Sequence, residues 1–150
     1  MRSWITVLAC LSLVIPAALR PAQGADMNSA VGLWKTVDDK TGAARALVRI
    51  SFEHGAYVGR IEQSFRPGAE TRVCTACTDD RKDKPIIGLE IIRDMTGSDG
   101  EYGGGRILDP DNGSVYHCRI RLEDGGRKLV VRGYIGFTWI GRSQTWLREP

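Results

Sequence analysis

Residues 104–122, GGRILDPDNGSVYHCRIRL, hold the clearest secondary-structure signal in the chain. Two runs of β-forming residues flank the segment DPDNG at residues 109–113. Pro110 restricts φ to the value required at the first central position of a type I turn, Asp109 can accept hydrogen bonds from the turn backbone, and Gly113 tolerates a positive φ. The stretch therefore predicts an antiparallel β-hairpin and an all-β fold.

The same pattern of an apolar run followed by a polar turn repeats along the chain. Turn centres lie about 13–14 residues apart, except where residues 66–84 form a long polar loop. Even spacing with short turns is typical of an up-and-down antiparallel sheet, and eight such strands can close into a barrel without edges. A two-sheet sandwich would fit the same strands, but it needs long crossovers that the sequence lacks. We predict an eight-stranded antiparallel barrel with strands at residues 31–37, 43–52, 56–65, 85–95, 101–108, 114–122, 128–135 and 139–148.

Residues 1–24 carry the features of a secretory signal peptide. Arg2 supplies a positive charge, residues 4–15 form an apolar run too short to span a bilayer comfortably, and a small-residue cleavage site follows. Two weaker alternatives are an uncleaved anchor helix, which Pro16 opposes, and a lipoprotein signal, which the position of Cys10 inside the apolar run opposes. We therefore expect a bacterial protein that is periplasmic or secreted.

The rest of the chain is expected to form one domain. Residues 25–30 are predicted to be a flexible lead-in, and residues 31–150 a single barrel, since the length suits one domain and not two. The formal charge of +3 falls to about +1 without Arg2 and Arg20, and basic residues alternate with acidic ones. This pattern gives no support to nucleic-acid binding, and we expect no membrane span in the mature chain.

Three cysteines remain in the mature chain, and two of them form a CxxC motif, Cys74 and Cys77, in the long loop. In an exported protein such a pair is expected to form a local disulfide. A redox centre is less favoured because it needs an α/β unit. A metal site is less favoured because its further candidate ligands, His117 and Cys118, are adjacent in a strand and point to opposite faces. We expect Cys118 to be a buried free thiol and the chain to bind no metal.

Residues 114–122 alternate clearly, with one face formed by Tyr116, Cys118, Ile120 and Leu122. Arg49 and Arg132, by contrast, interrupt otherwise apolar runs. Such an arginine usually lies on an outer face with its stem flat, but at the mouth of a barrel it could bind an anionic group bidentately. The candidate ligand-binding residues are Trp34, Arg49, Tyr116, Arg132 and Trp146.

The sequence contains no recognisable catalytic constellation. His54 lies in a predicted turn and His117 on the polar face of a strand, and the serines lie in no nucleophile elbow. The glycine-rich segment at residues 101–106 is followed by no helix that could bind a phosphate. Acidic residues at 79–83 alternate with basic ones, as is more typical of a solvated loop than of a calcium site. We expect a protein that is not an enzyme, has no catalytic residues and needs no cofactor.

Gly32-Leu33-Trp34, followed by meandering strands, resembles the opening of lipocalins and their calycin relatives. That resemblance implies that Trp34 closes one end of the barrel and packs on an arginine of the last strand, either Arg142 or Arg148. A closer resemblance rests on the blocks GLWKTVDDKTG, RALVRI, GRI, CTAC, DRKDKPIIGLEI, GGRILDPDNGSVYHCRIRL, LVVRGYIG and GRSQTW. Together these blocks cover nearly the whole mature chain, and they resemble the bacterial family called domain of unknown function 2147 (DUF2147). That resemblance implies a small exported protein with a lipocalin-like barrel, and it implies no activity.

Two functions are compatible with these expectations. The first is binding of a small apolar or amphipathic molecule, with or without an anionic group, inside the barrel. The second is a barrel filled by its own aromatic residues, which presents the loop at residues 66–84 to a protein partner in the cell envelope. An enzyme is least favoured, because no catalytic pair can be identified by spacing. A cavity of about 300 Å³ or more would favour binding over the filled barrel.

Overall fold

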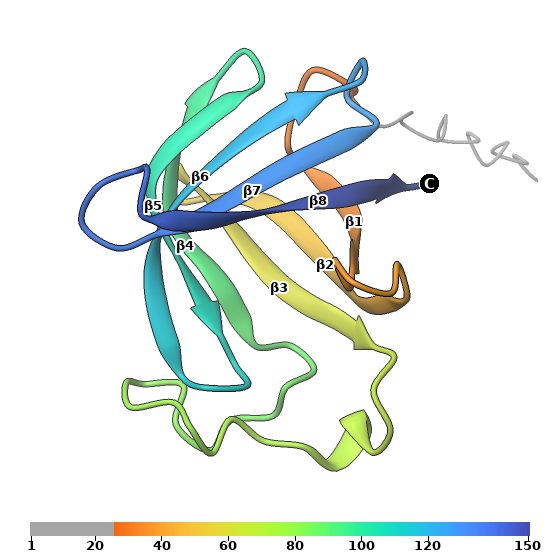
Figure 1. The fold of residues 1–150 in the computed structure, drawn as a ribbon, viewed down its shortest axis with the longest axis vertical. Helices are drawn as coiled ribbons and strands as arrows, with labels where there is room; N and C mark the ends of the chain where they lie inside the picture. Colours follow the sequence, from red (N-terminus) through yellow and green to blue (C-terminus); the bar gives the residue numbers. More distant parts are fainter. Residues whose placement is uncertain (1–25) are drawn as a thin grey trace, which may run out of the picture.

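The computed structural model describes residues 26–150, so the predicted signal peptide lies outside the described residues. Within that part, eight antiparallel strands follow one another around a closed barrel, and β8 pairs with β1 to complete it (Figure 1). The predicted all-β, up-and-down barrel is confirmed.

Among these residues, no helix has the length and apolar character needed to cross a membrane. The elements are β1 (Gly32–Val37), β2 (Ala44–Glu53), β3 (Ala56–Ser64), the short helix η1 (Ala69–Thr71), β4 (Glu90–Ser98), β5 (Glu101–Asp109), β6 (Ser114–Glu123), β7 (Lys128–Tyr134) and β8 (Gly141–Glu149).

The hairpin between β5 and β6 is present as predicted. The Gly113 amide donates to the Asp109 carbonyl at 2.8 Å, and Gly113 has a φ of 75°. Asp109 pairs with Ser114 across the turn, which sets the register of both strands. The inward residues of β6 are the predicted ones: Tyr116, Cys118, Ile120 and Leu122.

The fourth strand and the last two strands have bounds that differ from those predicted. Residues 85–89 do not belong to β4. The amide of Ile86 donates to the Arg72 carbonyl and that of Gly88 to the Ile61 carbonyl, which holds this stretch against the preceding connection and β3. β4 begins at Glu90 and continues to Ser98, beyond the predicted end of this strand at residue 95. Toward the end of the chain, Ile135, Trp139 and Ile140 were predicted to lie in the last two strands, and they lie instead in the β7–β8 loop. Apolar content alone did not separate strand from connection at either place.

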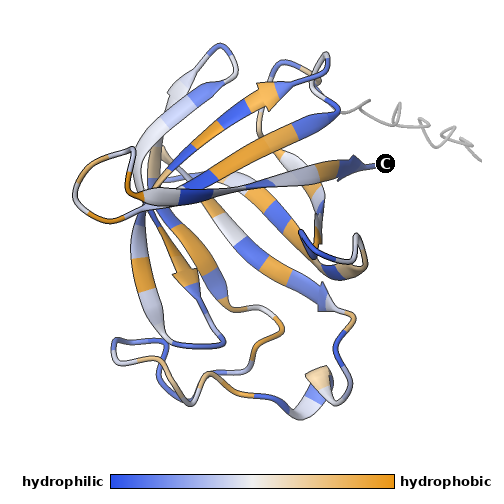
Figure 2. Ribbon diagram, in the orientation of Figure 1, coloured by the Kyte–Doolittle hydropathy of each residue, from blue (hydrophilic) through white to orange (hydrophobic). Residues whose placement is uncertain are grey.

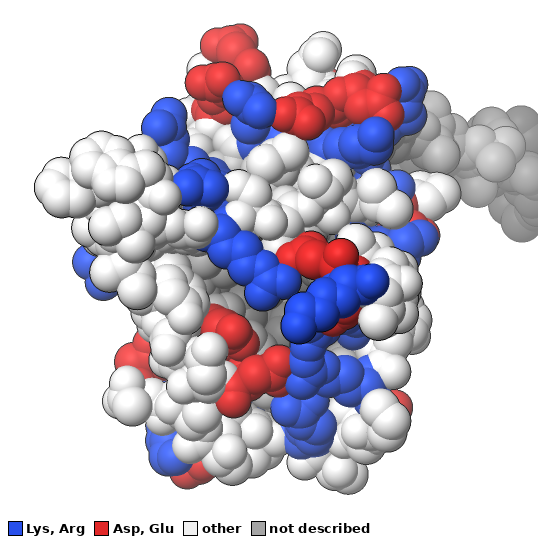
Figure 3. Space-filling view, in the orientation of Figure 1, with Lys and Arg blue, Asp and Glu red and all other residues white. Residues whose placement is uncertain are grey.

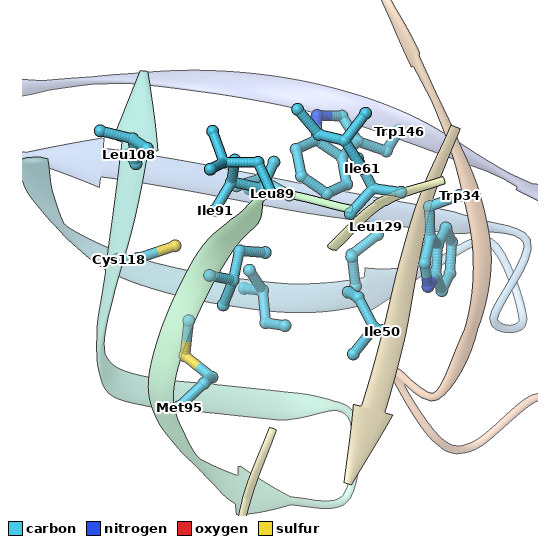
Figure 4. Close-up of a cluster of buried hydrophobic side chains, with 14 of the residues drawn as sticks. Trp34, Ile50, Ile61, Leu89, Ile91, Met95, Leu108, Cys118, Leu129 and Trp146 are labelled. Carbon is cyan, nitrogen blue, oxygen red and sulfur yellow. The ribbon is translucent and has the colours of Figure 1, made fainter. Parts of the chain in front are cut away.

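The core lies inside the barrel, where one face of each strand is buried. Bands of apolar and polar residues alternate along the strands in Figure 2, as expected when one face is inside and the other outside. The buried side chains come from strands around the barrel and point toward one another (Figure 4). The largest fully buried ones are Trp34, Trp146, Ile50, Ile92, Met95 and Leu129.

Trp34 and Arg148 close one end of the barrel. Trp34 is fully buried, and the guanidinium carbon of Arg148 lies 4.3 Å from the centroid of its ring, in a cation–π contact. The β1–β8 register makes the two residues direct partners. Arg148, and not Arg142, is therefore the arginine that packs on Trp34.

Residues 26–30 are not the flexible lead-in predicted from the sequence. They contain no helix or strand, but Ala30 is fully buried and its carbonyl accepts from Nε1 of Trp34 at 2.8 Å. The Ala30 amide donates to the Tyr102 hydroxyl at 3.1 Å, and Nη2 of Arg148 donates to the Ser29 carbonyl at 2.7 Å. The segment plugs the barrel at this end, so the opposite end is the open one.

Candidate ligand-binding cavity

A cavity of about 600 Å³ opens at the unplugged end of the barrel. The connections β1–β2, β3–β4, β5–β6 and β7–β8 surround its mouth (Figure 1). This end of the barrel is not filled by its own side chains, which argues against the filled-barrel alternative. The volume exceeds the threshold of about 300 Å³ that separates the two functions considered from the sequence.

The inner walls of the cavity are mainly apolar. Apolar residues from strands β2 to β5 and β7 form most of them. Such walls favour the apolar part of a ligand by the hydrophobic effect, without a directional requirement. Two polar side chains, those of Tyr116 and Gln144, lie among them. The apolar wall residues are Val48, Ile61, Ile91, Ile107, Leu108 and Val131.

Three arginines meet at one aspartate on the rim of the cavity. Nη1 of Arg66 lies 2.5 Å from Oδ1 of Asp111, and Nη2 of Arg72 lies 3.3 Å from the same oxygen. Nη2 of Arg45 lies 3.4 Å from the other carboxylate oxygen. Basic and acidic side chains accordingly lie side by side around the hollow of this face in Figure 3. Asp111 alone thus faces three guanidinium groups, which present more N–H donors than one carboxylate can accept.

Other carboxylates contact the outer side of this rim. Nη1 of Arg45 lies 3.2 Å from Asp38, and Arg142 forms an ion pair with Asp39. Hydrogen bonds from the backbone amides of Thr41 and Lys40 hold the pKa of Asp38 below its usual range. Asp38 therefore stays ionised at neutral pH and remains a partner for Arg45.

The disulfide loop positions the turn that carries Asp111. The disulfide between Cys74 and Cys77, predicted from the CxxC motif, is confirmed, with Cα atoms 5.4 Å apart. The Pro110 carbonyl lies 3.7 Å from Sγ of Cys74, and a Cβ on Gly113 would lie only 1.9 Å from the carbonyl oxygen of Ala76. The β5–β6 turn is thus in direct backbone contact with the disulfide loop.

The acidic and basic segment at residues 79–84 is mostly exposed, as expected from its charges, but Arg81 within it is buried. The Arg81 side chain is only 4% exposed, and its Nη1 donates to the Glu90 carbonyl at 3.0 Å. Arg93 binds Asp80 at 2.7 Å and thereby holds the pKa of that carboxyl well below its usual range. These contacts anchor the β3–β4 connection, which carries Arg66 and Arg72, to strand β4.

Of the three aromatic candidates from the sequence, Tyr116 lines the cavity. Trp34 lies at the closed end, under Arg148, and fills the barrel there. Trp146 is buried one inward position deeper than the cavity-lining Gln144, and its Nε1 donates to the Gln144 side chain at 3.3 Å. Two of the predicted aromatic residues therefore form the floor of the barrel interior and not the wall of the cavity.

Arg49 and Arg132 lie on the outside of the barrel, as is usual for an arginine within an apolar run, and they are not the ligand-binding residues at its mouth that the alternative interpretation proposed. Nε of Arg49 donates to Glu62 on the next strand at 2.7 Å, and Nε of Arg132 donates to the Thr138 carbonyl at 2.7 Å. The neighbours of both arginines along the chain face the barrel interior, so strand alternation turns both guanidinium groups outward.

The residues that form the charged rim were not predicted from the sequence: Arg45, Arg66 and Arg72. Arg45 stands at the start of a strand, and the other two lie in the long connection, outside any periodic pattern. Asp111, their common partner, occupies a hairpin turn where a charged residue is ordinary. The local sequence contains no signal that would bring these four side chains together.

Catalytic and metal-binding groups are sparse in the described residues. Among residues 26–150, no three His, Cys, Asp or Glu side chains are arranged to hold a metal ion. His54 lies in the β2–β3 turn, and His117 is exposed on the outer face of β6, where its ring stacks on Tyr134. Neither histidine lines the cavity.

We expect Cys118 to be unreactive in the folded protein. The free thiol is buried, and this burial raises its pKa to about 12, so almost no thiolate forms at neutral pH. A chain beginning at Asp26 should show no reaction with a disulfide thiol reagent in buffer and one thiol in guanidinium chloride. Prior reduction should raise the count to three, because it frees Cys74 and Cys77. Three thiols without reduction would contradict the disulfide, and rapid reaction of the native protein would contradict the burial.

Comparisons with known proteins agree with this architecture. The sequence profile of the family described as "Uncharacterized protein conserved in bacteria (DUF2147)" matches residues 32–148. No curated protein matches the chain. A similar solved structure is described as "Protein HP1028 from the human pathogen Helicobacter pylori belongs to the lipocalin family", with a TM-score of 0.70 and 15% identity over 81% of this chain and 84% of that one. At this identity the likeness shows a shared fold and nothing about the ligand.

Proposed function

We propose that this chain, which belongs to the DUF2147 family and has a lipocalin-like barrel, binds a small amphipathic molecule. The observation that carries the proposal is an apolar cavity of about 600 Å³ with three arginines on its rim. Small-molecule sites are typically about 300–1,000 Å³ and combine apolar walls with a few polar groups that orient the ligand. The apolar part of the ligand would lie against residues such as Val48, Ile91 and Val131.

The anionic group of the ligand would bind where Asp111 now lies. The Asp111 carboxylate accepts from Arg66, Arg72 and Arg45, and it cannot use all the donors that three guanidinium groups present. A carboxylate or phosphate on the ligand would share these donors or displace Asp111 from them. Asp111 thus occupies the position that a ligand anion would take.

We further propose that the protein acts after export, in the periplasm or outside the cell. The apolar run at residues 4–15 with its cleavage site supports this location, and so does a structural disulfide, which persists in oxidising compartments.

The rim arginines are expected to select for an anionic ligand. Binding of decanoate and of 1-decanol, which share a chain length and differ in charge, is measured by isothermal titration calorimetry. We expect Arg66→Gln with Arg72→Gln to weaken decanoate binding by about 10–100-fold, since charge-assisted hydrogen bonds contribute about 1.5–3 kcal/mol. Binding of 1-decanol should change by less than about twofold, because its apolar chain contacts the unchanged walls.

Arg49→Gln is the matched control, because Arg49 also binds a carboxylate but lies on the outer surface. It should leave both affinities unchanged. An equal loss for decanoate and 1-decanol would mean that Arg66 and Arg72 act only through packing. Native mass spectrometry of protein purified from its own host is the broader test. Absence of any co-purified small molecule, together with no binding of either probe, would contradict the proposed function.

A further inference from the structure

The β7–β8 loop, residues 135–140, exposes an unusual cluster of large apolar side chains. Trp139 is 73% exposed and Phe137 is 61% exposed. Their rings stack on each other, with centroids 4.5 Å apart and planes within 4°, and do not pack on the core. The loop projects from the barrel at the left of Figure 1 and is largely apolar in Figure 2. Its exposed apolar residues, here called the apolar tip, are Ile135, Phe137, Trp139 and Ile140.

Single exposed apolar residues are ordinary, but a contiguous cluster at the tip of a loop marks a surface that contacts something else. Trp and Phe are favoured where one side of a group is apolar and the other is wet, as at a membrane–water interface. The tip joins the cavity mouth, because Ile135 and Ile140 also line the cavity.

Two arginines without acidic partners lie beside the apolar tip. Arg119 and Arg132 are direct cross-strand neighbours on the outer face of β6 and β7, and in residues 26–150 neither forms an ion pair with a carboxylate. Like charges placed opposite one another destabilise a sheet. An anion bound between Arg119 and Arg132 would offset this repulsion. Arg132 also donates to the Thr138 carbonyl, so its guanidinium group lies against the β7–β8 loop.

A groove of about 670 Å³ separates the loop from this part of the sheet. Trp139 and Thr138 lie on its loop side, and the two unpaired arginines lie on its sheet side. The other charged residues that line it are Arg121, which forms an ion pair with Glu123 on the same strand, and Glu101. The groove is therefore positive beside the aromatic residues.

We propose that the apolar tip and the arginine pair dock the protein on an anionic lipid bilayer. Phe137 and Trp139 would enter the interfacial region, while Arg119 and Arg132 would bind lipid phosphate groups. An aromatic tip flanked by uncompensated arginines complements such a surface in both polarity and charge. Docking in this way would place the cavity mouth next to the bilayer, where amphipathic molecules reside.

The proposal is tested by co-sedimentation with vesicles, using a chain that begins at Asp26. This chain contains every strand of the closed barrel and lacks the apolar run at residues 4–15. Vesicles of phosphatidylcholine alone are compared with vesicles that also contain phosphatidylglycerol. We expect the protein to bind the anionic vesicles at least tenfold more tightly, and binding to weaken as salt is raised.

Two double variants separate the two parts of the docking surface. Phe137→Ser with Trp139→Ser should weaken binding to anionic vesicles at least tenfold, and Arg119→Gln with Arg132→Gln should remove the preference for phosphatidylglycerol. Phe52→Ser is the control for the first, since Phe52 is also exposed but lies on β2. Arg49→Gln is the control for the second, since Arg49 is an exposed arginine that has a carboxylate partner. Circular dichroism and Tm confirm that each variant is folded.

Trp139→Phe provides a direct readout of insertion. Brominated lipids should quench the fluorescence of the unmodified protein, and this variant should bind equally well but lose most of the quenching. Three results would overturn the proposal: no vesicle binding, equal binding by the tip variant, or a dimer in light scattering that the tip variant dissociates while vesicles stay unbound. The last result would identify a second copy of the chain as the partner. Decanoate binding is measured separately, so a failure here leaves the proposed ligand function intact.

Discussion

Replacement of Trp34 by Ala is expected to lower the free energy of unfolding by about 3–5 kcal/mol, the range for large buried aromatic residues. Trp34 is fully buried, and its Nε1 donates to Ala30. Its ring also supports Arg148, whose Nη1 and Nε donate to the carbonyls of Val31 and Gly126 at 3.0 and 2.7 Å. Removing the indole therefore leaves a cavity and weakens the contacts that hold residues 26–30 across the closed end.

Urea unfolding followed by far-UV circular dichroism measures this effect, and Trp139→Ala is the matched control. Trp139 is mostly exposed, so its removal should change the unfolding free energy by less than about 0.5 kcal/mol. A loss of under about 1 kcal/mol for Trp34→Ala would mean that the closed end does not hold the barrel together.

Gly113→Ala is expected to destabilise the protein by about 3 kcal/mol or more, through two additive causes. A φ of 75° strains any residue with a Cβ by about 1–2 kcal/mol. The new Cβ would also lie 1.9 Å from the Ala76 carbonyl oxygen, so the β5–β6 turn must move away from the disulfide loop. Since this turn carries Asp111, the rim of the cavity should change as well.

Gly42→Ala separates the two causes. Gly42 has a φ of 71°, close to that of Gly113, but a Cβ there would meet nothing within 4 Å. Its replacement should cost only the conformational strain of about 1–2 kcal/mol. Urea unfolding of both variants gives the difference, and decanoate titration reports whether the rim has moved. Equal destabilisation of the two variants would show that the close approach of Gly113 to the disulfide loop adds nothing to the loss of stability.

Much of the fold was predictable because its determinants are local. Pro110 and Gly113 specify a turn within a few residues, and alternation along β6 specifies which side chains face inward. The pairing of Cys74 with Cys77 is local for the same reason, since a three-residue separation leaves their Cα atoms 5.4 Å apart. Apolar content was less informative: Trp139 and Ile140 were predicted to begin the last strand, yet they lie in an exposed loop.

The arginine that packs on Trp34 shows where local reasoning stops. Arg142 and Arg148 are an even number of residues apart on β8, so alternation places both on the inward face. Which one meets Trp34 depends on the β1–β8 register, and that pairing joins strands from opposite ends of the domain. Closure of the barrel puts Arg148 at the plugged end and leaves Arg142 on the rim of the cavity.

The sequence by itself determined that strands pair antiparallel with their neighbours, which side of β6 is buried, and which cysteines join. Only the tertiary structure decided that Arg45, Arg66 and Arg72 meet at Asp111 over an open cavity, and that the two arginines chosen from the sequence lie outside it. The physical reason is that alternation with a two-residue period shows whether a side chain faces the inside or the outside of the barrel. It does not show at what height along the barrel axis that side chain lies. That height follows from closure, from register and from the path of the β3–β4 connection.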